Sequence, residues 1–171
     1  MATLRELDDR DLLFKLDPQL SYREQPDRFI YASPRLRAWV SGELPGLASQ
    51  WDLETPPIEQ FDTMVYEFCV GEELEVDRRF KKLKPLGRDI WELKTADLRV
   101  FGWFNFRDFF IGYAAEEKWK CLEIPGLVDK YVGEAAKFRA ELDLDEPKCV
   151  TGENCDDVVS NWCYPAQTSR R

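Results

Sequence analysis

Residues 89–115, DIWELKTADLRVFGWFNFRDFFIGYAA, decide the fold of this chain. The stretch is rich in apolar and aromatic residues and is interrupted by two short polar segments, at 95–97 and 105–108. Such a pattern predicts strands separated by turns. We predict three strands, over 89–94, 98–106 and 109–115. Because consecutive strands with short connections pair antiparallel, they form a meander.

Three amphipathic segments flank the meander and predict helices. Ser33 and Pro34 are a favourable N-cap and first residue for a helix over 33–44, which follows a short strand at 29–32. Two further helices are predicted over 55–71 and 125–142. The fold class is therefore α+β, with helices packed on one face of a small antiparallel sheet.

A length of 171 residues suits one domain. We divide the chain into an acidic N-terminal extension (1–27), an α+β domain (28–145) and a C-terminal extension (146–171). No apolar run reaches the roughly 18–20 residues that span a bilayer, and the start, MATLRELDDRD, lacks a signal-peptide core. We therefore expect a cytoplasmic protein without a membrane partner.

The chain has five cysteines and no histidine. An odd number of cysteines without compact spacing favours free thiols. Cys149, Cys155 and Cys163 could in principle hold zinc, but no C-x2-C pair is present. The absence of histidine excludes Ser-His and Cys-His nucleophile pairs. We predict no metal and no cofactor.

Charge is distributed unevenly. Residues 1–77 carry 7 basic and 17 acidic side chains, whereas 78–88 contain six cations and no acid. A basic cluster in an acidic chain suggests two surfaces with different partners. The cluster either binds phosphates or balances the acidic first half. Its members are Arg78, Arg79, Lys81, Lys82, Lys84 and Arg88.

Two further cations lie in the first hairpin of the meander. If Lys94 pairs with Arg99 across the strands, like charges stand side by side, which costs stability unless an anion binds between them. A slip of one residue would instead place Arg99 opposite Leu93. Lys118 follows the meander, near Tyr113. A basic sheet surface with nearby aromatic rings suits single-stranded RNA.

Four motifs resemble the RelE/HigB superfamily of bacterial and phage toxin–antitoxin ribonucleases. They are the basic approach KKLKPLG, the hairpin WELKTADLRVFGWF, the terminal helix LVDKYVGEAAKFRAELDLD and the opening FIYASPRLRAWV. The resemblance spans residues 28–145. It implies a compact fold without a cofactor that cleaves mRNA, commonly on the ribosome, and a cognate antitoxin that restrains it.

The resemblance also implies site residues. Lys94 and Arg99 match the hairpin cations that assist attack of the 2′-hydroxyl on the phosphate. Lys81, Lys82 and Lys84 match the approach lysines, so that Lys84 joins the catalytic set. Lys118 matches as an acid and Tyr113 as a stacking or proton-donating group. Arg78, Arg79, Lys81, Lys82 and Arg88 are then the RNA-binding residues.

The chain departs from the family in lacking histidine and in being acidic, with a net charge of −9. These departures favour an alternative, a non-catalytic module or inhibitor, encoded by a phage or another mobile element, that binds a basic protein through its acidic surface. The sequence leaves both functions open.

Overall fold

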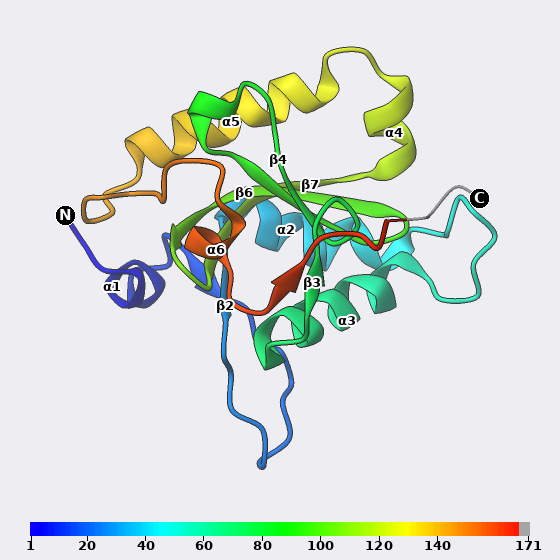
Figure 1. Cartoon of the computed structure of the whole chain (residues 1–171), viewed down its shortest axis with the longest axis horizontal. Coiled ribbons are helices and arrows are strands. Elements are labelled where there is room, and N and C mark those ends of the chain that lie inside the picture. Colours follow the sequence, from blue (N-terminus) through cyan, green and yellow to red (C-terminus); the bar gives the residue numbers. More distant parts are fainter. Residues whose placement is uncertain (168–171) are drawn as a thin grey trace.

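The computed structural model describes residues 1–167, which form one mixed sheet with helices around it (Figure 1). The strand order is β1-β2-β7-β6-β5-β4, with β2 parallel to β7 and every other pair antiparallel. The strands are β1 (Phe14–Lys15), β2 (Phe29–Ala32), β4 (Phe80–Lys82), β5 (Trp91–Lys94), β6 (Leu98–Phe106) and β7 (Phe109–Glu117).

The α+β class and the three-stranded meander β5-β6-β7 are confirmed. The prediction of an antiparallel sheet is wrong, because β2 joins the free edge of β7 in parallel. The local patterns that predicted the hairpins concern neighbours along the chain. They carry no information on how a strand about 80 residues away pairs.

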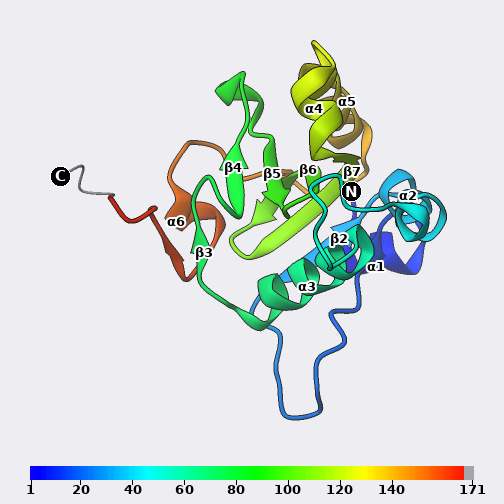
Figure 2. The same cartoon turned by 90° about the vertical axis from the view of Figure 1, so that its right-hand side faces the viewer.

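The helices cover both faces of the sheet, which corrects the prediction of one covered face (Figures 1 and 2). One face carries α2 (Pro34–Gly42) and α3 (Pro57–Val70), and the other carries α1 (Leu4–Asp9) and α5 (Leu127–Glu141). A short helix, α4 (Lys118–Glu123), joins β7 to α5.

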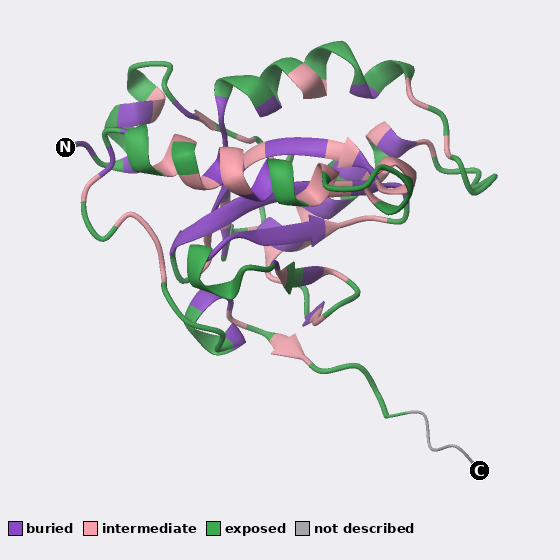
Figure 3. Ribbon diagram, turned by 90° about the horizontal axis from the view of Figure 1, so that it is seen from above, coloured by how far each residue is buried: buried purple, intermediate pink, exposed green. Residues whose placement is uncertain are grey.

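The residues of β6 explain why both faces are covered. Val100 and Phe104 enter the core beneath α2 and α3, whereas Phe101 and Trp103 enter the core beneath α5. All four side chains are at most 2% exposed. A strand buried on both faces needs this nearly continuous apolar run. The sheet is accordingly buried and the outer helix surfaces are exposed (Figure 3).

The helix ends follow their local signals. The Ser33 hydroxyl accepts a hydrogen bond from the Leu36 amide, as an N-cap does. Helix α3 ends at Gly71, whose φ of 89° is the left-handed conformation that glycine adopts without steric cost. The N-cap of α3 is Pro56 and not the predicted Thr55, so the helix begins one residue later, at Pro57, because a residue before proline is held in extended conformation.

Both terminal segments contribute to the core. Leu7 and Leu13 are fully buried beneath α5, and Val158 and Val159 are buried beside α3. The buried Arg28 side chain donates to backbone carbonyls of both α3 and the C-terminal segment. The remaining elements are β3 (Leu74–Glu75), which pairs in parallel with β8 (Trp162–Cys163), α6 (Cys155–Val158), and the 3-10 turns η1 (Leu44–Gly46) and η2 (Leu86–Arg88).

No helix within residues 1–167 combines the length and the apolar composition that crossing a bilayer requires. The five cysteines are free thiols.

Candidate functional site

The predicted cross-strand pair of cations is confirmed. Lys94 on β5 lies directly opposite Arg99 on β6, so both side chains leave the same face of the sheet. The Lys94 amide also donates to the carbonyl of Arg79, at 2.8 Å, which brings the turn before β4 alongside. Three segments of the chain therefore place cations at one end of the sheet.

A pocket of about 440 Å³ opens at this end. We call it the cationic pocket, because five of its lining side chains are positively charged and one is a carboxylate. It is lined by Asp77, Arg78, Arg79, Lys94, Thr95, Ala96, Arg99 and Lys118. The sequence predicted all five of these cations as site residues. The pocket is therefore the largest group of predicted residues that the fold brings together.

Local backbone geometry orients the cationic side chains on both flanks of the pocket. Arg78 and Arg79 lie in the tight turn between β3 and β4, which Asp77 opens with a φ of 67° and a hydrogen bond to the carbonyl of Phe80. Lys118 is the first residue of α4, and its amide donates to the carbonyl of Asp97 at 2.6 Å. Both flanks of the pocket are thus held by backbone hydrogen bonds.

Lys94 and Arg99 are partly buried, and this shifts their pKa values. Burial lowers the pKa of the Lys94 ammonium and of the Arg99 guanidinium, because a charged group loses hydration there. The Lys94 Nζ donates to the carbonyl of Asp77 at 2.7 Å. The Arg99 Nη1 donates to the carbonyls of Thr95 and Leu98, at 2.7 and 2.8 Å. These bonds fix both cations with neutral acceptors, which do not cancel their charge.

Glu92 is the carboxylate nearest to Lys94, with 3.6 Å between its Oε1 and the lysine Nζ. Its side chain is 9% exposed, and burial raises the pKa of this carboxyl. The sequence analysis missed Glu92. A glutamate between the apolar Trp91 and Leu93 of a short strand was the signal that could have indicated it.

The remaining ion pairs around the pocket are weak. Arg79 lies 3.5 Å from Glu67, and Arg78 lies 3.9 Å from Glu75 with its own side chain 71% exposed. Pairs in contact with solvent contribute about 0–1 kcal/mol and exchange readily. Among the described residues, Arg99 and Lys118 form no ion pair. The pocket therefore keeps a net positive charge.

The other basic residues of the 78–88 cluster lie elsewhere. Lys82 points to the opposite face of the sheet, where its Nζ contacts Asp89 at 2.7 Å and its side chain is 7% exposed. Lys84 and Arg88 are exposed in the β4–β5 connection. Lys81 is exposed and pairs across the strands with Glu92, at the border of the site. We leave Lys82, Lys84 and Arg88 out of the candidate site.

Tyr113 also lies apart from the cationic pocket. Its hydroxyl accepts a hydrogen bond from the Arg35 Nη1 at 2.9 Å, and its ring centroid lies 5.3 Å from that of Phe138 on α5. Tyr113 therefore packs between the sheet and α5 and does not line the pocket.

A buried polar network supports the pocket from behind, and it was not predicted. Asp97 is 3% exposed and accepts from the Gln60 side chain at 2.6 Å and from the Gln50 amide at 3.1 Å. The Gln60 Oε1 in turn accepts from the hydroxyl of Thr95, which lines the pocket. The network joins α3 and the loop before it to the hairpin turn.

Within residues 1–167 no group of three or more histidine, cysteine, aspartate and glutamate side chains is arranged to hold a metal ion, Cys149, Cys155 and Cys163 included. No protein-family model, no curated protein and no solved structure matches this chain.

Proposed function

We propose that this chain is a RelE/HigB-like protein that binds mRNA through the cationic pocket and cleaves it without a metal. One observation carries the proposal: Lys94 and Arg99 stand side by side on the sheet and form one wall of a pocket with three further cations. Such a concentration of positive charge suits a phosphodiester, whose charge offsets the repulsion between the two side chains.

The chemistry follows from the protonation of Lys94. A lysine whose pKa is lowered by burial spends more time neutral near pH 7, and the neutral amine can accept a proton. In the proposed reaction, the amine takes the proton of a ribose 2′-hydroxyl. The 2′-oxygen then attacks the adjacent phosphorus, and the bond from phosphorus to the 5′-oxygen of the next nucleotide breaks, with that oxygen taking up a proton.

The other cations of the pocket stabilise charge. Arg99 is held by two backbone carbonyls, so it acts as a fixed positive charge beside the phosphate. Lys118 also lines the pocket, and its ammonium group can donate a proton to the leaving oxygen.

Cleavage of RNA and arrest of translation by the purified protein test this function. We expect a Lys94→Ala/Arg99→Ala variant to lose the activity, because it lacks both the base and the fixed charge. Lys137→Ala is the matched control, since that lysine is 77% exposed on α5, where it pairs with the exposed Glu141. Equal activity of the double variant and the wild type would remove these residues from the mechanism.

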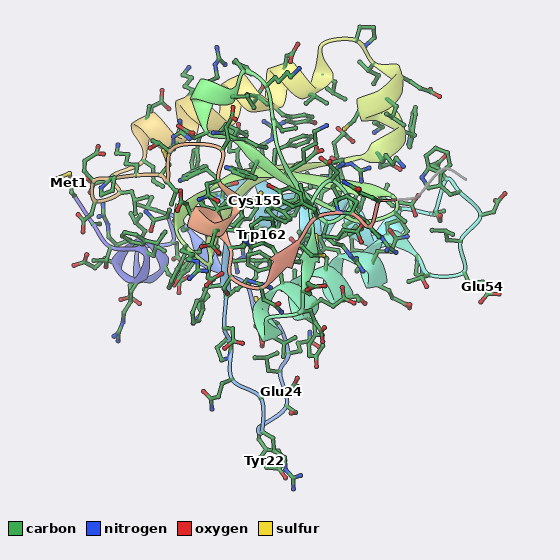
Figure 4. All side chains as sticks on the ribbon, in the orientation of Figure 1. Met1, Tyr22, Glu24, Glu54, Cys155 and Trp162 are labelled. Atoms are coloured by element: carbon green, nitrogen blue, oxygen red, sulfur yellow. The ribbon has the colours of Figure 1, made fainter. Side chains whose placement is uncertain are left out.

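A second candidate function is the binding of a basic protein partner without catalysis. The observation that favours it is the β1–β2 connection, which extends away from the body and carries Tyr22 at its tip, 87% exposed (Figure 4). Residues 1–77 of the same half have a net charge of −10. A pull-down separates the two functions. Ribosomes or RNA support the first, and one stoichiometric basic protein without nuclease activity supports the second.

A further inference from the structure

An exposed tryptophan stands at the rim of the cationic pocket. Trp51 belongs to the loop between η1 and α3. This loop extends from the body and carries Glu54 at its outer end (Figure 4). Its side chain remains 47% exposed, and its ring centroid lies 5.2 Å from the Nζ of Lys118. Because Lys118 lines the pocket, the indole ring stands next to the proposed phosphate site.

Hydrogen bonds before and after Trp51 in the sequence hold this loop to the body. The Gln50 amide donates to Asp97 at 3.1 Å, and the Gln60 side chain donates to the carbonyl of Thr55 at 3.0 Å. The Ser49 hydroxyl accepts from the amide of Trp51 itself, at 3.3 Å. The position of Trp51 at the rim is therefore built into the fold.

A second hollow of about 540 Å³ continues from the cationic pocket along α3. The two share Arg79, Thr95 and Ala96. The second adds the apolar Leu53 and Met64, the carboxylates Glu54 and Glu67, and the polar Thr55, Gln60 and Thr63. The result is one groove with a cationic end and an end that mixes apolar, polar and acidic side chains.

We propose that Trp51 stacks on a base of single-stranded RNA whose phosphate occupies the cationic pocket. This inference rests on the proposed function and specifies its ligand as single-stranded RNA with an unpaired base beside the bound phosphate. Aromatic rings bind unpaired bases of any sequence by stacking, and a neighbouring cation binds the connecting phosphate. Trp51 thus contributes affinity for the base, whereas Lys94, Arg99 and Lys118 contribute affinity for the phosphate.

The test compares two probes. One is a short 2′-O-methyl oligoadenylate, which has bases but no 2′-hydroxyl to react, and the other is inorganic tripolyphosphate, which has charge but no bases. We expect Trp51→Ala to weaken oligoadenylate binding roughly 5- to 150-fold, the range for loss of one stacked base, and to leave tripolyphosphate binding unchanged. Trp51→Phe keeps a ring and should bind the oligoadenylate nearly as the wild type does.

Phe106→Ala is the control variant, because Phe106 is an aromatic residue, 53% exposed, at the end of β6 opposite to Arg99. Wild-type binding of oligoadenylate by Trp51→Ala, with loss of binding by Lys94→Ala/Arg99→Ala, would overturn the stacking and keep the proposed function. An equal loss for both probes would mean that Trp51 acts only by positioning Lys118, and would also overturn the stacking. Absence of oligoadenylate binding by the wild type would overturn both proposals.

Discussion

Two lysines on neighbouring strands, Lys82 on β4 and Lys94 on β5, have opposite environments. Lys82 is enclosed, with its Nζ 2.7 Å from the Asp89 carboxylate and a further hydrogen bond to the carbonyl of Gly152. Lys94 lines an open pocket, and its nearest carboxylate, Glu92, is 3.6 Å away. The alternation of side chains along a strand sends the two to opposite faces. Lysines close together in the sequence can therefore be structural on one face of the sheet and available for binding on the other.

The largest loss of stability should come from breaking the ion pair between Lys82 and Asp89. Lys82→Ala leaves the Asp89 carboxylate buried without its cation, and we expect the free energy of unfolding to fall by about 3–5 kcal/mol. Lys94→Ala should cost less, because the pocket admits water. Denaturant unfolding measures both variants. If Lys82→Ala lost less unfolding free energy than Lys94→Ala, the comparison between the two lysines would be wrong.

An intermediate effect is expected at the network behind the pocket. Asp97→Ala removes the buried carboxylate that accepts from the backbone amide of Gln50 and from the side chain of Gln60, which should cost about 1–3 kcal/mol in the free energy of unfolding. Glu141→Ala is the matched control, because that carboxylate is 66% exposed and its removal should change stability by less than about 0.5 kcal/mol. Similar unfolding curves for the two variants would show that Asp97 does not hold the pocket.

The comparison also explains how far the sequence predicts this molecule. The Lys94–Arg99 pair was predictable because a short turn sets the register of the hairpin. The enclosure of Lys82 was not predictable. It depends on Asp89, which the β4–β5 connection places beside the lysine, and on Gly152 of the C-terminal segment. Trp51 was not predicted either, because its loop has no periodic pattern and approaches Lys118 only in the folded chain.

The smallest effect concerns the pH dependence of stability at Glu92. Burial raises the pKa of its carboxyl above 4.5 in the folded protein, so the folded state binds this proton more tightly than the unfolded state. The associated stability is present below pH 4.5 and is lost as pH rises through the folded pKa. Glu92→Gln has no carboxyl group at this position, so it does not lose stability in this way as the pH rises.

Unfolding free energies of the wild type and Glu92→Gln, measured from about pH 4 to about pH 7, test the sign. The variant should gain stability relative to the wild type as the pH rises. If the difference in unfolding free energy between the two proteins stays constant over this range, the pKa of Glu92 is not raised. Burial would then have no effect on the ionisable groups beside Lys94.

The salt dependence of RNA binding tests the central claim most directly. We predict that the logarithm of the affinity for a short 2′-O-methyl oligoribonucleotide falls linearly with the logarithm of salt concentration, with a slope of about −0.7 for each phosphate contacted. Lys94→Ala/Arg99→Ala should bind more weakly and with a shallower slope. Lys137→Ala should match the wild type. Identical slopes for the wild type and the double variant would contradict the account.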